Sequence, residues 1–349
     1  MKYSIIVPVF NRPNEVDELL TSLTIQTFTN FEVVIVEDGS KTTCKDVCDK
    51  YSNSLDLKYF IKENSGPGQS RNYGAKRANG DYLIILDSDV VLPKNYMQAI
   101  DDEINNNHAD AFGGPDRAHE SFTDTQKAIS YSMTSFFTTG GIRGGKKKLD
   151  KFYPRSFNMG IKRDVYSKLN GFSDMRFGED IDFSIRIFKS GYNCRLFPAA
   201  WVWHKRRTDF HKFWKQVFNS GIARINLYKK YPESLKLVHL LPMVFTVGMM
   251  ILFSLCIAGI ITMLTTTEEK WQSLGHIMTL CACLPIILYC LLLFADSTKV
   301  NKSIKVGLLS IVAAYVQLTG YGCGFISSWW KRCVKGQDEF SAYKKTFYK

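Results

Sequence analysis

The chain has 349 residues, a formal net charge of +12 and an apolar fraction of 45%. Its length is sufficient for one large domain or two ordinary ones. The positive charge suits contact with anionic lipids or anionic substrates. Because the sequence lacks a recognition helix and an aromatic stacking platform, we expect no nucleic-acid partner.

Short apolar runs alternate with helical patterns in the first two thirds of the chain. We expect strands at residues 4–10, 31–36, 57–61 and 81–86, and helices that include residues 15–26 and 71–78. Strands that are apolar throughout are buried on both faces, as in a parallel sheet covered by helices. The first part of the chain is therefore predicted to be an α/β fold.

Polar residues follow three of these strands where the strands end. These ends carry residues 8–11, the pair Glu37 and Asp38, and the triplet 87–89. In parallel sheets ligands bind at the carboxyl ends of strands, so we expect the acidic side chains to converge at one edge. Asp87 and Asp89 could share a hard divalent cation. They could equally cap the next helix, because Asp is common in caps and turns.

Taken together and in this order, these motifs resemble those of family 2 glycosyltransferases with the GT-A fold. The resemblance covers about residues 1–230, and its motifs are residues 6–11, 34–40, 64–74, 86–89 and 171–180. It implies a GT-A nucleotide-binding fold with a mostly parallel central sheet, followed by an α-helical membrane domain. We expect the catalytic domain at residues 1–208, an amphipathic interface helix and linker at 209–235, and a membrane domain with a basic tail at 236–349.

The resemblance implies a donor site at the ends of the first strands. Asp38 would receive the nucleobase edge, Pro8 and Phe10 would shape that pocket, and Arg71 would contact the base or a phosphate. The complete set implied for the donor nucleotide is Pro8, Phe10, Asn11, Glu37, Asp38, Arg71, Asp87 and Ser88. We expect a nucleotide-sugar donor, with a UDP-sugar as the preferred class.

The resemblance also implies a metal ion and a catalytic base. Asp89 and Asp87, completed by His204, would hold Mn²⁺ or Mg²⁺, and imidazole suits Mn²⁺ better. Asp180 would deprotonate the acceptor hydroxyl, and Glu179 would orient the acceptor. A base and a metal site suffice for a single displacement with inversion. The alternatives are a structural His204 and simple first-turn acids of a helix ending near Lys189.

Further contacts follow from the same resemblance. The acceptor or sugar pocket is expected to comprise Gly114, Asn158, Met159, Gly160 and Glu179. The diphosphate contacts are expected among Lys205, Arg206, Arg207 and Arg224. Residues 140–151 form either an acceptor-binding lid or a solvated loop. The Gln-x-x-Arg-Trp motif of polymer-making members is absent after Gln216, which favours transfer of one sugar.

The last third of the chain is predicted to be membrane-embedded. Residues 238–264, 277–295 and 306–330 are apolar enough to span a bilayer. Residues 209–228 form an amphipathic pattern typical of an interface helix or of ordinary packing on the sheet. The charged residues predict that residues 265–275 lie outside and that residues 296–305 lie inside. Three crossings would then place the carboxyl-terminal tail outside, although its lysines and arginine predict that it lies inside. Either the third segment does not cross, or the charge rule fails here.

We therefore predict an integral membrane enzyme whose catalytic domain lies on the cytoplasmic side of a bacterial inner membrane. It would move a single sugar from a nucleotide sugar to a hydroxyl of a lipid-linked or membrane-proximal glycan, in cell-envelope polysaccharide or glycolipid assembly. Its further partners would be membrane lipids. One alternative is a polyprenyl-phosphate glycosyltransferase. Another is a non-catalytic membrane scaffold that retains the fold.

Overall fold

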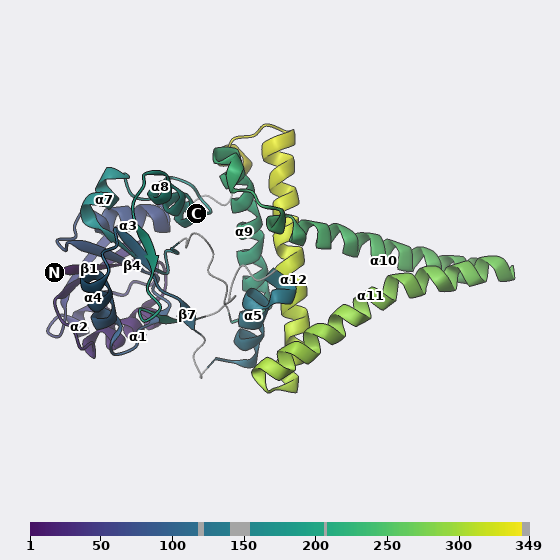
Figure 1. Ribbon diagram of the computed structural model, residues 1–349, viewed down its shortest axis with the longest axis horizontal. Helices are drawn as coiled ribbons and strands as arrows, with labels where there is room; N and C mark the ends of the chain where they lie inside the picture. Colours follow the sequence, from purple (N-terminus) through teal and green to yellow (C-terminus); the bar gives the residue numbers. More distant parts are fainter. Residues whose placement is uncertain (118–121, 140–153, 206–207, 344–349) are drawn as a thin grey trace. The chain divides into compact units, whose positions relative to one another are not determined.

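The computed structural model describes residues 1–117, 122–139, 154–205 and 208–343 (Figure 1). The described residues fall into two compact units. The first contains those of Met1–Glu120, Lys148–Lys205 and Glu339–Lys349, and the second those of Ser121–Lys147 and Arg206–Asp338. The predicted boundaries at residues 208 and 235 stay predictions.

The first unit is built on a seven-stranded sheet with the order β3-β2-β1-β4-β8-β6-β9. Within it only β8 runs against its neighbours, so the predicted mostly parallel sheet is confirmed. A small second sheet has the order β5-β10-β7. The strands are β1 (Tyr3–Val9), β2 (Phe31–Asp38), β3 (Asp56–Lys62), β4 (Tyr82–Leu86), β5 (Val90–Val91), β6 (Ala111–Gly113), β7 (Asp116–Arg117), β8 (Asn158–Lys162), β9 (Cys194–Leu196) and β10 (Val202–His204).

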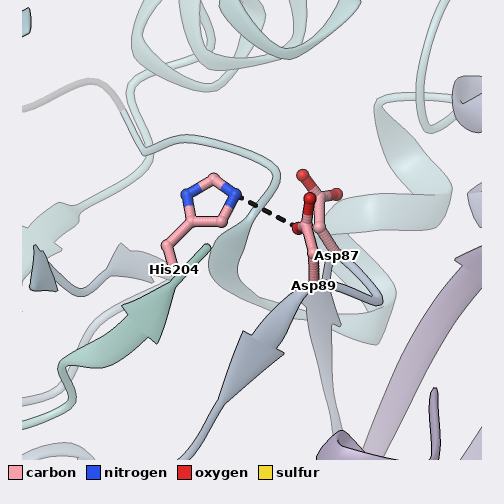
Figure 2. Close-up of side chains that lie close together, drawn as sticks. All are labelled: Asp87, Asp89 and His204. Atoms are coloured by element: carbon pink, nitrogen blue, oxygen red, sulfur yellow. Dashed lines mark ion pairs between the residues drawn. The ribbon is translucent and has the colours of Figure 1, made fainter. Parts of the chain in front are cut away.

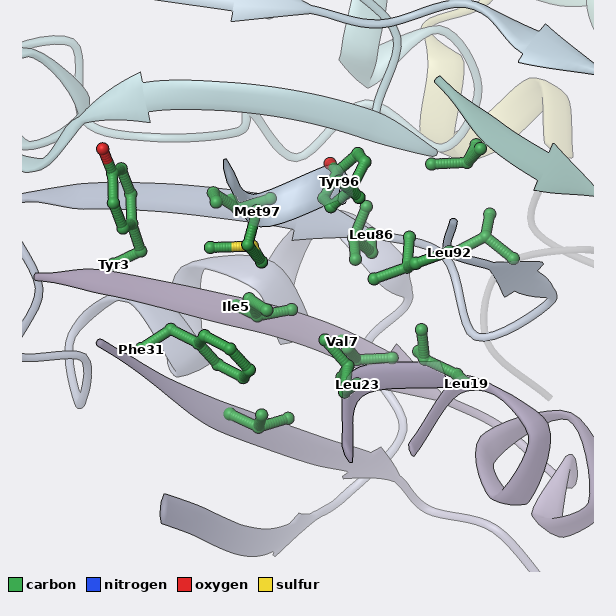
Figure 3. Close-up of a cluster of buried hydrophobic side chains, with 14 of the residues drawn as sticks. Tyr3, Ile5, Val7, Leu19, Leu23, Phe31, Leu86, Leu92, Tyr96 and Met97 are labelled. Carbon is green, nitrogen blue, oxygen red and sulfur yellow. The ribbon is translucent and has the colours of Figure 1, made fainter. Parts of the chain in front are cut away.

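Helices cover both faces of this sheet, which explains the continuous apolar runs of its central strands. Ile5 and Val7 of β1 point into one core cluster (Figure 3), whereas Ile6 belongs to the other. All eight residues of β2 are buried. The helices of this unit are α1 (Pro13–Thr24), α2 (Lys45–Tyr51), α3 (Pro67–Ala75), α4 (Tyr96–Asn106), α7 (Arg163–Lys168), α8 (Glu179–Lys189) and α13 (Glu339–Tyr343).

Two of these helices begin with a proline in the first turn, where the missing amide hydrogen costs no hydrogen bond. α8 begins differently, after Gly178 with a left-handed backbone at φ 88°. Glycine adopts this conformation without steric cost. The turn before α8 therefore places Glu179 and Asp180 in the first turn of the helix, as the sequence predicts.

The second unit is helical. Asp209 caps α9, because its side chain accepts a hydrogen bond of 2.7 Å from the Lys212 amide. Three described helices, α10, α11 and α12, are long and apolar enough to cross a membrane. The elements are α5 (Asp124–Thr134), α6 (Phe136–Thr139), α9 (Phe210–Lys230), η1 (Pro232–Ser234), η2 (Leu237–His239), α10 (Leu241–Thr265), α11 (Glu269–Asn301), α12 (Ile304–Trp329) and a π-helical turn, η3 (Trp330–Val334).

One close contact in the central sheet generates a stability prediction. Gly160 of β8 lies opposite Phe112 of β6, whose ring stacks on Phe197 with centroids 4.4 Å apart. A Cβ atom at position 160 would lie 1.9 Å from the Phe112 ring. Because a packed core resists added volume, we expect Gly160→Ala to lower the free energy of unfolding by about 1–3 kcal/mol. Thermal or urea unfolding in detergent measures this change.

Gly248 of α10 provides the matched control, since a Cβ there meets nothing within 4 Å and the backbone is helical. Gly248→Ala should not lower the stability of the parent, because alanine favours a helix more than glycine does. Equal stability of the two variants would contradict the packing at Gly160.

Candidate active site

The carboxyl end of β4 carries two carboxylates that meet an imidazole from β10. Asp87 and Asp89 occupy the turn between β4 and β5. Because β10 pairs with β5 in the register His204↔Val90, His204 lies beside Asp89 (Figure 2). One ligand atom from each of the three side chains lies within 4.8 Å of the others. His204 Nε2 is 3.2 Å from Asp89 Oδ1.

Neighbouring groups hold this cluster in place. The Phe157 ring stacks on the His204 imidazole, with centroids 4.8 Å apart. Arg12 donates a hydrogen bond of 2.6 Å to Asp89 Oδ2, and the Lys205 amide donates one of 3.0 Å to the Asp89 carbonyl. Two carboxylates and one imidazole form a suitable donor set for Mn²⁺, and a less suitable one for Mg²⁺. The residues fit a divalent cation, which would compete with the Arg12 guanidinium for Asp89.

Arg71 connects this cluster to α8. Its side chain, supplied by α3, is only 3% exposed. It donates to Asp87 Oδ1 at 2.9 Å and to Glu179 Oε1 at 3.0 Å, and its guanidinium lies 5.2 Å from the centre of the Phe172 ring. Burial alone would lower the pKa of Arg71, but the carboxylates of Asp87 and Glu179 outweigh it, so that pKa is raised. Arg71, which was predicted to contact the nucleotide-sugar donor, thus binds two carboxylates of the protein itself.

The arrangement around Arg71 perturbs the pKa of Glu179. Burial raises its pKa above the usual range, Arg71 opposes that rise, and the neighbouring Asp180 adds to it. The side chain of Glu179 is therefore held in place by Arg71 rather than by solvent. This geometry is typical of a residue that positions its neighbours.

Asp180 lies next to Glu179 in the first turn of α8, with its side chain 17% exposed. Its Oδ1 accepts a hydrogen bond of 2.8 Å from the Ile181 amide, and its Oδ2 is 3.4 Å from Arg155 Nη1. The amino terminus of a helix stabilises a carboxylate. Asp180 therefore combines a fixed orientation with access, which a general base requires.

The predicted nucleobase residue lies at the carboxyl end of β2. The Asp38 carboxylate accepts hydrogen bonds from the amides of Ser65 and Gly66, at 2.9 and 2.8 Å, and from Lys62 Nζ at 2.5 Å. These partners are at the end of β3 and in the turn that leads into α3. Asp38 is thus a fixed acceptor that already has a cationic neighbour.

The other predicted donor residues divide into accessible and internal ones. Phe10 is 44% exposed after β1, and Pro8 is half-buried. Asn11 accepts from the amides of Lys41 and Thr42, at 2.8 and 3.0 Å, which connects the loops after β1 and β2. Ser88 is buried in the turn after β4.

Glu37 is fully buried at the end of β2. It accepts hydrogen bonds from the Cys44 amide at 2.8 Å, from the Tyr59 hydroxyl at 3.1 Å and from Ser40. These contacts explain why an acidic residue is buried here, because Glu37 holds the loop that follows β2 in place. Its predicted role in the donor site stays a prediction.

The predicted sugar-pocket residues lie in or beside the sheet. Asn158 pairs with Leu86 at the end of β4, donates to the Ala200 carbonyl at 2.8 Å and accepts from the Tyr96 hydroxyl at 2.7 Å. Gly114, Met159 and Gly160 are packed against neighbouring core atoms. Their packing explains these residues without a ligand, so their role in a pocket stays a prediction.

Of the predicted diphosphate contacts, Lys205 and Arg224 belong to the described residues, one in each unit. Lys205 forms an ion pair with Glu18 of α1. Arg224 is on α9, in the second unit, and its buried Nε has no hydrogen-bond partner among the described residues. Arg206, Arg207 and the predicted loop at 140–151 lie outside the described residues.

Sequence reasoning missed four residues that complete this site. They are Arg12, Lys62, Arg155 and Phe157. For Arg12 there was one signal in the sequence, because a basic residue in the turn after β1 can supply counter-charge to the two acidic strand ends. The other three have no local signal, since each meets its partner only through the tertiary fold.

Comparison with known proteins finds a family model that matches part of the chain. Residues 4–169 match the family model described as glycosyl transferase family 2. The poly(ribitol-phosphate) beta-N-acetylglucosaminyltransferase TarS of Staphylococcus aureus is 40% identical over 114 residues, 32% of this chain and 20% of that protein. An uncharacterized glycosyltransferase of Haemophilus influenzae is 33% identical over 194 residues, 53% of this chain and 62% of that protein. The chain thus spans less than two thirds of either relative's length.

A solved structure supports the fold. The mannosyltransferase PcManGT from Pyrobaculum calidifontis, in complex with GDP-Man and Mn²⁺, superimposes with a TM-score of 0.56 at 14% sequence identity. The match covers 95% of this chain and 88% of that one. Together with the mostly parallel sheet and the helical carboxyl-terminal part, it confirms the predicted GT-A fold class.

The partly buried Glu179 generates a pH prediction. In an unfolded chain its pKa is near 4.5, and in the folded chain it is higher. Its contribution to stability is therefore full below the unfolded pKa and is lost as pH rises through the folded pKa. Glu179→Gln removes this titration, so the melting temperature of the variant relative to the parent should rise as the pH increases above about 4.5, the unfolded value.

Any cost of Glu179→Gln that does not involve the charge of residue 179 is constant with pH, and the attraction of Arg71 for the charged form is already contained in the pKa of Glu179. The slope of the difference against pH, and not its absolute value, is therefore the measurement. Glu63→Gln, at an exposed site, is the control and should show a flat difference. A flat difference for Glu179→Gln would contradict the burial described above.

Proposed function

We propose that this chain, whose residues 4–169 match the glycosyl transferase family 2 model, transfers a single sugar with inversion from a nucleotide-sugar donor to an acceptor hydroxyl. The observation that carries this proposal is the connection of Asp87, Asp89 and His204, through Arg71, to the helix turn that bears Asp180. A site for the leaving nucleotide and a base for the acceptor are thus held in one network.

The donor side uses residues at the strand ends. Asp38, fixed by two amides, is suited to accept a hydrogen bond from a nucleobase N–H group. We take a UDP-sugar as the preferred donor class. Asp87, Asp89 and His204 would hold Mn²⁺ or Mg²⁺, which when bound would neutralise charge on the diphosphate.

The acceptor side uses Asp180. As the acceptor oxygen forms its bond to the anomeric carbon, the bond from that carbon to the diphosphate oxygen breaks. The hydroxyl proton passes to the Asp180 carboxylate, and the diphosphate leaves with the electron pair. Attack opposite the leaving group inverts the anomeric configuration. Glu179, clamped by Arg71, fixes the turn from which Asp180 acts.

The acceptor class follows from the rest of the chain. Three described helices are long and apolar enough to cross a membrane. We therefore propose a lipid-linked or membrane-proximal glycan acceptor, in cell-envelope polysaccharide or glycolipid assembly, with the catalytic part on the cytoplasmic side. Similarity over 114 residues to TarS, whose name assigns it sugar transfer to a polymer, is compatible with this class.

Replacement of the base tests the proposed chemistry. Asp180→Asn keeps the size of the side chain but cannot take a proton, so we expect sugar transfer to fall by about 10²–10⁴-fold. Nucleotide binding, measured as the thermal shift with a nucleoside diphosphate and Mn²⁺, should persist. Transfer is measured as release of nucleoside diphosphate in the presence of membrane glycolipid extracts.

Asp164→Asn, an exposed change on α7, is the matched control and should keep full activity. Unimpaired transfer by Asp180→Asn to a glycan hydroxyl would overturn the role of Asp180. Unimpaired transfer to a polyprenyl phosphate alone would instead favour a lipid-phosphate acceptor, because that acceptor carries no hydroxyl proton to remove.

Replacement of a ligand tests the metal site. A nucleoside diphosphate at 100 times its Kd should stabilise the parent by about 2.7 kcal/mol in the presence of Mn²⁺. We expect chelator to abolish this shift and Asp89→Ala to lack it, because Asp89 belongs to the carboxylate–imidazole cluster. An equal shift with chelator would contradict metal dependence. Failure of every nucleotide to shift the parent would favour the scaffold alternative.

A further inference from the structure

The three apolar helices of the second unit are not equivalent. In the most apolar window of α10 and of α11, 11% of the residues are buried, whereas in that of α12 44% are buried. A helix that faces lipid on most sides needs few protein contacts. α12 is instead largely covered by other helices of its own unit, so its apolar character has a second explanation.

α10 and α11 form an antiparallel hairpin that extends away from the other helices of this unit (Figure 1). At their crossing a Cβ added to Gly259 would lie 2.8 Å from the Gly275 carbonyl oxygen. Such close packing of small residues is typical of helix pairs in membranes. Large apolar side chains are exposed along both helices, including Met250, Phe253, Leu264, Ile277, Leu280 and Leu291.

α12 instead lies along α9 in the same direction. A Cβ at Gly320 would meet Val217, and one at Gly324 would meet the Phe218 carbonyl. Further along both helices, Ser328 donates to the Ile222 carbonyl at 3.5 Å, and Arg332 donates to Asn226 at 3.1 Å. Residue numbers rise together on the two helices, so they run parallel from about Val217 to Asn226.

α9 is a poor candidate for the bilayer interior. It carries Lys212, Lys215 and Arg224, and the two lysines are exposed. A lysine or arginine at the centre of a membrane helix costs about 2.5–3.5 kcal/mol. Were α12 to cross the membrane, the parallel contacts would carry much of α9 with it. The packing of α12 on α9 therefore opposes a third crossing.

α5 fixes the other end of α12 in the same way. Lys305, at the start of α12, forms an ion pair of 2.8 Å with Asp124 of α5. The Tyr131 hydroxyl donates a hydrogen bond of 2.6 Å to Asp296, near the end of α11. α5 is short and polar, so these contacts place the end of α11 and the start of α12 in a polar setting.

We infer that the chain crosses the membrane twice, through the α10–α11 hairpin, and that α12 stays with α9 and α5 on the side from which the hairpin enters. Exposed Leu308 and Val312, one helical turn apart on α12, leave an apolar edge for lipid at that surface. The inference is independent of the proposed chemistry.

This topology also removes the conflict in the charge pattern. With two crossings, Lys299, Lys302 and Lys305 share a side with Lys331, Arg332 and Lys335. Glu268, Glu269 and Lys270 lie at the hairpin tip on the other side. The charge rule, which counts lysine and arginine in short connections, then assigns one cytoplasmic side.

Native lysines allow a test without any substitution. Sealed membrane vesicles of both orientations are treated with a membrane-impermeant amine reagent, and the labelled lysines are identified by mass spectrometry. Lys45 and Lys168 in the first unit, both with exposed side chains, mark the catalytic side. We expect Lys302, Lys331 and Lys335 to be labelled from that side, and Lys270 from the opposite side only.

Labelling of Lys331 and Lys335 together with Lys270, from the side opposite to Lys302, would establish a third crossing and overturn the inference. Labelling of Lys270 from the same side as Lys302 would overturn the spanning hairpin. A failure of glycosyl transfer would leave both results unchanged, so the two proposals are tested separately.

Discussion

The buried guanidinium of Arg71 is the interaction on which the site depends. A charge that is 3% exposed must be paired, and removal of one partner of a buried pair typically costs about 3–5 kcal/mol. Arg71 is paired twice, with Asp87 at the end of β4 and with Glu179 at the start of α8. The turn of the metal cluster and the turn of the base therefore cannot shift independently without leaving a buried charge uncompensated.

The sheet explains why these two turns meet. β1, β2 and β4 run parallel, so their polar carboxyl ends share one edge. β8 enters antiparallel beside β4, and the short β5–β10 pair brings His204 back to Asp89. The sheet topology thus brings residues that are far apart in sequence to one polar edge. Arg71 of α3 links this edge to the first turn of α8.

The sequence was sufficient for what local patterns encode. Apolar strands ending in acids predicted the edge with Asp38, Asp87 and Asp89, and a helix ending near Lys189 was expected with Glu179 and Asp180 in its first turn. It was insufficient for partners set by tertiary packing, such as Arg155 beside Asp180 and Lys62 beside Asp38. Arg71 was predicted to contact the donor, but only the fold shows that two carboxylates engage it.

In the helical unit, too, charged side chains limit where the neighbouring elements can lie. Here the apolar environment that they must avoid is lipid rather than the protein core. By length and mean hydropathy α10, α11 and α12 are all candidate spans, although the value is 1.4 for α12 against 2.5 and 2.6 for the other two, and hydropathy ignores what covers a helix. The glycines of α12 let it approach α9 closely, and α9 brings lysines that require water or head groups. An apolar helix packed on a charged helix must stay outside the bilayer interior together with that helix. In the same way, the two turns around Arg71 must stay beside its buried charge.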